Sequence, residues 1–212
     1  EIKNAPKAGV DIKTDVTNDS DTEATGVSVK STVYNKESDV ISTQTDDITV
    51  AAGKTETISQ SVDVANPKLW SVDSPNLYWV RTEIIQNGKV VDRTDSRFGI
   101  RYIATNPNSG FYLNGVHTKL NGVCEHSDLG SLGMETYQAA VDRRIRTLKK
   151  YGVNAIRTSH NPVSPEFIEA CDRLGMLVFE EAFDQWLYSK NSDDYHNYFN
   201  KAADGKTVVF DK

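Results

Sequence analysis

One segment, residues 152–181, restricts the possible folds of this chain more than any other. A short apolar run at 153–156 ends in the polar loop 157–162. The next stretch, 165–175, begins with Pro and ends with Gly, which is the usual asymmetry of a helix, and a second apolar run follows at 176–179. Strand, loop, helix and strand in this order predict two parallel strands joined by a right-handed crossover. The polar loop then lies at the carboxyl end of a strand, where α/β barrels carry their chemistry.

The same pattern extends toward the N-terminus of this segment. Residues 135–151 predict an amphipathic helix, because apolar side chains recur at close to 3.6-residue spacing, at Tyr137, Val141, Ile145 and Leu148. We also predict a short lead-in strand at 111–117 and the first parallel strand at 119–125. The result is the first three β-α units of a (β/α)8 TIM barrel, which needs about 250 residues when complete.

The first part of the chain has a period of two. Alternating apolar residues predict strands at 10–16, 27–34, 40–50, 55–64, 77–85 and 90–98. Asn87-Gly88 between the last two is a strong hairpin signal. Several short strands without a helical period predict an immunoglobulin-like β-sandwich. We therefore predict two domains, a sandwich at 1–101 and an incomplete barrel at 102–212.

Charge and composition exclude some functions. The net charge of −6 at pH 7 argues against a nucleic-acid partner, which normally requires a basic surface. No apolar run reaches the roughly 20 residues of a membrane span. Cys124 and Cys171 lack any metal-binding spacing, and we predict two buried thiols, with a disulfide as the alternative. The compartment stays open between cytoplasm, periplasm and the cell exterior.

Polar side chains follow all three predicted parallel strands. Taken singly, each has an ordinary explanation as a cap, an ion pair or a packing residue. The carboxyl ends of parallel strands meet at one rim, however, so we expect the side chains to converge, which favours a functional site. The predicted substrate-binding residues are His126, Arg157, His160, Asn161, Glu181, Asp184 and Trp186.

These residue types suit a carbohydrate. Sugar hydroxyls both donate and accept hydrogen bonds, and His, Asn, Asp and Arg side chains together supply the matching donors and acceptors. The Trp186 ring can cover the apolar face of a sugar. A retaining glycosidase also needs two carboxylates about 5 to 5.5 Å apart. Glu180 and Glu181 are adjacent on the predicted strand and would point to opposite faces. We therefore predict no catalytic residue in this chain.

The chain resembles the family 2 glycoside hydrolases, the β-galactosidase and β-glucuronidase group, in motifs at 69–71, 75–78, 98–101, 111–115, 120–130, 157–160 and 180–186. The resemblance implies that His126, Arg157 and His160 line the sugar subsite. The last motif, EEAFDQW, is similar to that of bacterial β-galactosidase-like members, which implies roles for Asp184 and Trp186. Cys124 and Ser127 depart from the usual pattern around His126, which leaves the substrate open.

The resemblance also implies that this chain is an internal fragment of a retaining β-glycosidase. The acid/base and nucleophile Glu of the family follow the fourth and seventh barrel strands, beyond the three expected here. A β-galactosidase is favoured, with β-glucuronidase and β-mannosidase as alternatives. A different class, a non-catalytic module that binds a glycan or a protein partner, also fits. We expect no cofactor in this chain, and a divalent cation or a homo-oligomer only in the full-length protein.

Overall fold

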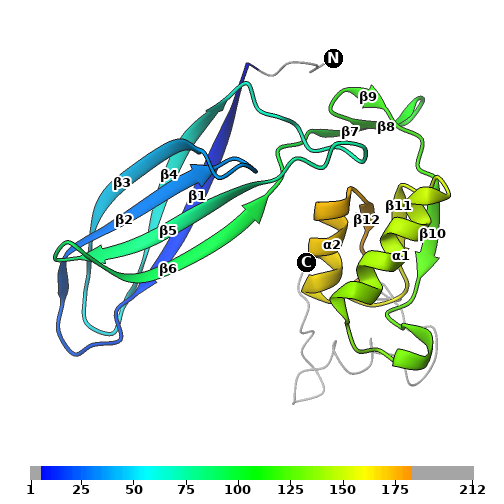
Figure 1. Cartoon of the computed structure of the whole chain (residues 1–212). Coiled ribbons are helices and arrows are strands. Elements are labelled where there is room, and N and C mark those ends of the chain that lie inside the picture. The colour runs from blue at the N-terminus through cyan, green and yellow to red at the C-terminus, as the bar shows by residue number, and fades with distance from the viewer. Residues whose placement is uncertain (1–5, 183–212) are drawn as a thin grey trace, which may run out of the picture. The chain divides into compact units, whose positions relative to one another are not determined.

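The computed structural model describes residues 6–182 (Figure 1). The chain divides into two compact units, Glu1–Lys119 and Leu120–Lys212. The first unit consists of antiparallel strands and the second of alternating strands and helices. The change from a two-residue to a 3.6-residue period in the sequence therefore corresponds to a change of architecture.

Six strands of the first unit form an immunoglobulin-like sandwich. They are β1 (Lys7–Thr17), β2 (Ala24–Tyr34), β3 (Val40–Val50), β4 (Thr55–Ala65), β5 (Tyr78–Gln86) and β6 (Lys89–Phe98). β1 pairs antiparallel with β4, and the other sheet has the order β3-β2-β5-β6. Asn87 and Gly88 both have positive φ, of 51° and 76°, as a two-residue hairpin turn requires. All six predicted strands are confirmed, with ends shifted by a few residues.

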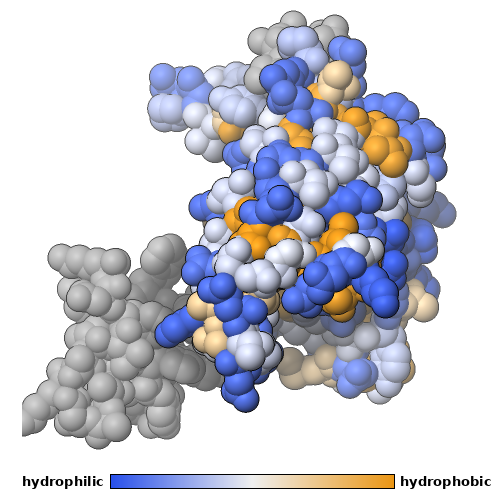
Figure 2. Space-filling model, turned by 90° about the vertical axis from the view of Figure 1, so that its left-hand side faces the viewer, coloured by the Kyte–Doolittle hydropathy of each residue, from blue (hydrophilic) through white to orange (hydrophobic). Residues whose placement is uncertain are grey.

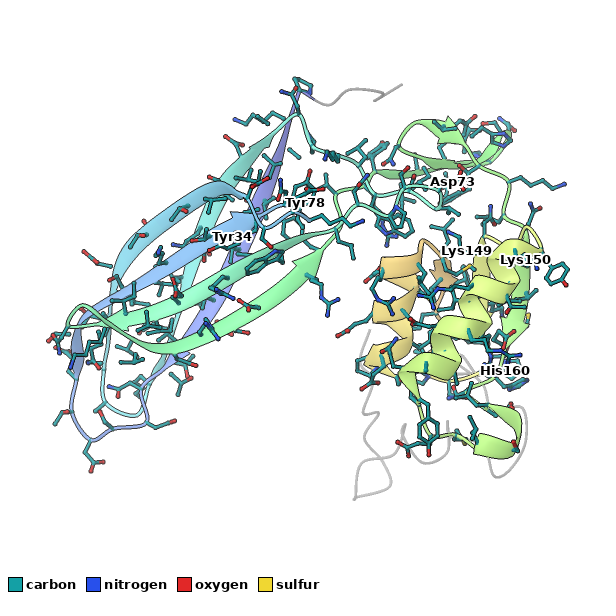
Figure 3. The ribbon with its side chains drawn as sticks, in the orientation of Figure 1. Tyr34, Asp73, Tyr78, Lys149, Lys150 and His160 are labelled. Carbon is teal, nitrogen blue, oxygen red and sulfur yellow. The ribbon has the colours of Figure 1, made fainter. Side chains whose placement is uncertain are left out.

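Successive side chains in these strands face alternately a buried core and the solvent. The inward residues Ile12, Val33, Val62, Tyr78 and Val80 form a buried cluster (Tyr78 is labelled in Figure 3). Hydrophilic residues cover much of the face that Figure 2 shows, and the hydrophobic ones there form small separate groups. A sheet with one buried and one polar face explains the period of two in the sequence.

Trp70, in the segment between β4 and β5, anchors the end of the sandwich. It is 1% exposed, and its backbone N–H donates to the Ile100 carbonyl at 2.8 Å. The Asn114 side chain donates to the Trp70 carbonyl at 2.9 Å, and the Arg101 guanidinium lies 4.8 Å from the ring centroid. Gly99 packs closely on this ring, because a Cβ there would lie 3.0 Å from the Trp70 Cβ and would force a small shift. These contacts join the chain beyond β6 to the sandwich core.

The lead-in to the second unit is a small antiparallel sheet and not a single strand. It contains β7 (Ile103–Asn106), β8 (Gly110–Leu113) and β9 (Val116–His117). The predicted strand at 111–117 is interrupted because Asn114 and Gly115 both adopt positive φ, of 54° and 77°. They form the tight turn between β8 and β9 that the Asn-Gly sequence favours.

The second unit contains three parallel strands and two helices. β10 (Gly122–Glu125), β11 (Ala155–Thr158) and β12 (Leu177–Phe179) lie in this order in one sheet. They are connected by a 3-10 turn, η1 (Gly130–Leu132), and by the helices α1 (Gln138–Lys150) and α2 (Pro165–Leu174). This arrangement confirms the predicted start of a TIM barrel.

Helix signals in the sequence are confirmed for α2 and partly for α1. Ser164 caps α2 by accepting from the Phe167 N–H at 3.3 Å, and Gly175 ends it with φ 76°. α1 begins at Gln138 and not at residue 135, because Tyr137 is extended and offers no capping oxygen. Lys149 (labelled in Figure 3) donates to the Leu174 and Gly175 carbonyls, at 2.6 and 2.9 Å, and so ties α1 to the end of α2.

The two cysteines differ, and the prediction that both are buried is wrong for one of them. Cys171 is buried in α2, and burial raises the pKa of its thiol to about 12. Cys124 is exposed and unbonded to Cys171. Its neighbour across the parallel ladder is Arg157, so both side chains stand on the same face of the sheet. Among residues 6–182, no helix is long and apolar enough to cross a membrane.

Candidate active site at the carboxyl ends of the parallel strands

Three neighbouring strand ends supply the candidate site, as the sequence predicts. β10 leads into His126, β11 carries Arg157 and leads into His160, and β12 leads to Glu181. Figure 3 shows His160 at the end of the second unit where the parallel strands finish. The Ser159–His160 peptide bond is cis. Short strands with polar loops beyond them therefore bring residues 126, 157, 160 and 181 to one rim.

Arg157, His160 and Glu181 form the centre of the site. One carboxylate oxygen of Glu181, Oε2, lies 2.8 Å from Arg157 Nη2 and 3.1 Å from His160 Nδ1. The Arg157 and His160 nitrogens are 3.4 Å apart. The Glu181 backbone N–H donates to Thr158 Oγ1 at 2.9 Å, which fixes the start of the loop. A single carboxylate thus orients both the guanidinium and the imidazole.

The electrostatics of Glu181 follow from these partners. Its partial burial acts to raise the pKa of the carboxyl group. The hydrogen bond with His160 and the positive charge of Arg157 outweigh that effect, so the pKa lies below the ordinary value for glutamate. Glu181 is therefore a permanent anion near neutral pH, which suits a residue that holds two others in place.

We expect the cluster to persist in mild acid and to open only as the pH falls through the lowered pKa of Glu181. Because the pKa of Glu181 is lower in the folded than in the unfolded chain, its stabilising effect is complete above the unfolded value of about 4.3. That effect is lost as the pH falls through the folded value. A 13C NMR titration of the Glu181 carboxyl should show a midpoint below the ordinary range, and His160→Ala should raise it. A midpoint above that range in the parent chain would contradict the arrangement.

His126 and Asn161 complete the rim as predicted. The His126 ring meets the His160 ring edge-on, with centroids 5.6 Å apart. Asn161 donates to Ser127 Oγ at 3.4 Å and to the Pro162 carbonyl at 3.1 Å. The loops after β10 and β11 are therefore linked, and both present exposed hydrogen-bonding groups.

Arg144, in α1, is a component of the site that sequence reasoning missed. It pairs with Glu125 at 3.1 Å and donates to the carbonyls of His126 and Asp128. It also lines a hollow between the loop after β10 and the first turns of both helices. A signal was present, because Arg144 lies close to the apolar stripe of α1 defined by Val141 and Leu148, where a charge needs a specific partner.

The prediction that the acidic pair lies on the strand is wrong. Glu180 and Glu181 do not alternate across a strand, because β12 ends at Phe179. Glu181 instead turns toward Arg157 and His160, while Glu180 is exposed. Asp184 and Trp186 lie outside the described residues. Within residues 6–182, no group of three or more His, Cys, Asp or Glu is placed to hold a metal ion, and the divalent cation of the full-length protein stays a prediction.

Comparison with known proteins decides the family. The sequence model of the family "Glycosyl hydrolases family 2" matches residues 1–101, and the model of the TIM barrel domain of the same family matches residues 105–208. The chain belongs to glycosyl hydrolase family 2. The sandwich and the partial barrel of this family 2 chain thus match two successive domains of that family.

Its relatives include enzymes named for two different sugars. The β-galactosidase BoGH2A of Bacteroides ovatus is 39% identical over 92% of this chain and 23% of its own length. A β-glucuronidase of Bacteroides fragilis is 32% identical over 56% of the chain and 17% of its own length. The crystal structure of a family 2 member from Bacteroides cellulosilyticus has a TM-score of 0.84 at 37% identity, over 92% of this chain and 26% of that one. This chain therefore spans about a quarter or less of these proteins.

Proposed function

We propose that the full-length protein hydrolyses β-linked glycosides, with β-galactosides preferred, and that this chain supplies part of the sugar subsite. The observation that carries the proposal is the triangle of Arg157, His160 and Glu181 beside His126, at the carboxyl ends of parallel strands. An α/β barrel places its chemistry at that end.

The triangle can bind sugar hydroxyls while remaining rigid. The Arg157 and His160 side chains are 41% and 46% exposed, so N–H donors remain accessible beyond those that face Glu181 and the Cys124 Sγ. Arg157 has five donors in a fixed plane, and only part of this fork faces the carboxylate. Donors that are already oriented lose little freedom when a sugar arrives, and they can strengthen as positive charge and ring flattening develop in the transition state.

Charge balance favours a neutral sugar over a glucuronide. Both rim cations that contact carboxylates are already paired, Arg157 with Glu181 and Arg144 with Glu125. A glucuronide brings a carboxylate that needs a cation of its own, and both of these arginines in the described part of the rim already bind a carboxylate of the protein. The β-glucuronidase among the relatives keeps a glucuronide as the second candidate.

The reaction itself requires carboxylates other than those at the described rim. Glu181 is held ionised by two partners and is a poor proton donor, and Glu125 is paired with Arg144. A retaining glycosidase needs one acid/base and one nucleophile about 5 to 5.5 Å apart. In our proposal, other parts of the full-length protein provide both, and residues of this chain bind and orient the glycone.

The test compares p-nitrophenyl β-galactoside, β-glucuronide and β-mannoside as substrates of the full-length protein. We expect kcat/KM to be highest for the galactoside and no turnover by the 212-residue chain alone. A higher kcat/KM for the glucuronide would make the glucuronide the preferred substrate. A full-length protein that has no glycosidase activity but still binds a glycan or a protein would support the alternative of a non-catalytic binding module. Turnover by the isolated chain, abolished by Glu181→Gln, would refute the assignment of roles.

A further inference from the structure

We propose that Arg144 is a positioning residue of the sugar subsite. Resting on the proposed function, this inference assigns to Arg144 the task of holding the loop after β10, and through that loop the His126 ring. The residue belongs to helix α1, which begins 12 positions after His126, so the sequence gives no direct link between the two.

The contacts of Arg144 span the base and the first turn of the loop. Nη1 lies 3.1 Å from Glu125 Oε2, at the last residue of β10, and 3.4 Å from the His126 carbonyl oxygen. Nη2 donates to the Asp128 carbonyl oxygen. One guanidinium therefore binds three acceptors on residues 125, 126 and 128, and its two arms fix their relative positions as a single point charge would not.

At its base the loop is also held by the Ser159 N–H, which donates to the Glu125 carbonyl at 2.8 Å, but the residues beyond Glu125 have weaker links to the rest of the unit. His126 and Asp128 are exposed, and Ser127 meets Asn161 at 3.4 Å. Arg144 is itself partly buried, with its side chain 25% exposed, and stands beside the buried face of α1. Helix α1 is held by the core of the unit through Val141 and Ile145. The guanidinium thus transfers the rigidity of the helix to an otherwise exposed segment.

The position of His126 matters because its ring meets that of His160 edge-on at 5.6 Å. If both rings contact the same sugar, a shift of about 1 Å in the loop misaligns one donor, and such misplacement costs up to about a hundredfold in rate. Removing Arg144 should therefore lower activity only through His126. That dependence distinguishes a positioning role from general support of the fold.

The hollow beside Arg144 makes the proposal testable by chemical rescue. Its lining includes His126, Asp128, Arg144, Val163 and Phe167. When Arg144 is shortened to Ala, the hollow extends to the vacated guanidinium position, and a small soluble guanidinium ion can enter and bind the same carbonyls. Urea has a similar shape but no charge, and serves as the control solute.

The experiment measures kcat and KM of the full-length enzyme for its best p-nitrophenyl glycoside. The variants are Arg144→Ala, Arg144→Lys, His126→Ala and the double variant Arg144→Ala/His126→Ala. Arg143→Ala, an exposed arginine on the same helix, is the matched control. We expect a loss of about tenfold or more in kcat/KM for Arg144→Ala and a smaller loss for Arg144→Lys. We expect less than a twofold effect of the same change in the His126→Ala background, partial rescue by millimolar guanidinium but not urea, and wild-type rates for Arg143→Ala.

Several results would overturn the inference. They are an effect of Arg144→Ala that is unchanged in the His126→Ala background, an equal loss in Arg143→Ala, or rescue by urea as effective as by guanidinium. If Arg144→Ala fails to fold, the same cycle with Arg144→Lys decides the question, because lysine keeps the stem and the charge and loses only the fork. An inactive wild-type protein would contradict the proposed function itself. An active wild type in which the effects of Arg144→Ala and His126→Ala simply add would contradict the role of Arg144 and leave the proposed function in place.

Discussion

His160→Ala should lower kcat of the full-length enzyme by roughly a hundredfold or more, with little change in thermal midpoint. The imidazole is 46% exposed and lies at the end of β11, held by Glu181 at 3.1 Å. A polar group so exposed contributes little to the core. A donor that stabilises the transition state typically contributes about 2.7 to 4 kcal/mol to catalysis. We therefore expect a large catalytic loss and a small structural one.

The measurement needs kcat and thermal midpoint from the same protein preparation, with His117→Ala as the matched control. His117 is also exposed, and its ring packs against Tyr112 at 5.4 Å in the first unit. It should keep wild-type turnover. An His160→Ala variant that melts earlier but keeps its turnover per folded molecule would show that His160 supports the fold and does not act on the sugar.

Much of this fold could be predicted because local and global signals agree. Val27, Val29 and Val33 of β2 have the same parity in the sequence, and the structure buries all three. Ser164, Pro165 and Gly175 mark the ends of α2, since each satisfies or avoids a backbone group that a helix terminus leaves unpaired. Such features depend on a few neighbouring residues, so the sequence shows them directly.

The missed features depend on contacts between residues far apart in the chain. The pairing of Glu181 with Arg157 depends on where β12 ends, and strand ends are poorly defined by composition. The exposure of Cys124 depends on which face of the parallel sheet is covered by other parts of the described chain. The role of Arg144 depends on how α1 packs over a loop 16 to 19 residues earlier. The sequence alone fixes none of these three packing relations.

Trp70→Ala should destabilise the first unit by about 3 to 5 kcal/mol, the usual cost of truncating a buried tryptophan. The ring is 1% exposed, and two neighbours are shaped around it. A Cβ at position 99 would lie 3.0 Å from the Trp70 Cβ, and the Arg101 guanidinium stacks 4.8 Å from the ring centroid. Truncation leaves a cavity that the backbone cannot fill, because the Trp70 N–H and carbonyl remain bonded to Ile100 and Asn114.

The control is Trp79→Ala, which removes the same side chain from the outer face of the sandwich. Trp79 is half-buried and stacks on Tyr34 at 4.0 Å, so its removal costs the stacking and partial burial but creates no enclosed cavity. Urea unfolding of the 212-residue chain, followed by hydrogen exchange of peptides from β2 and β5, measures both losses in the first unit. Peptides from α2 should keep their protection in both variants. A loss under about 1 kcal/mol for Trp70→Ala, or a larger one for Trp79→Ala, would show that the sandwich closes over the vacated space and that its end depends on the hydrogen bonds of Asn114 more than on the ring.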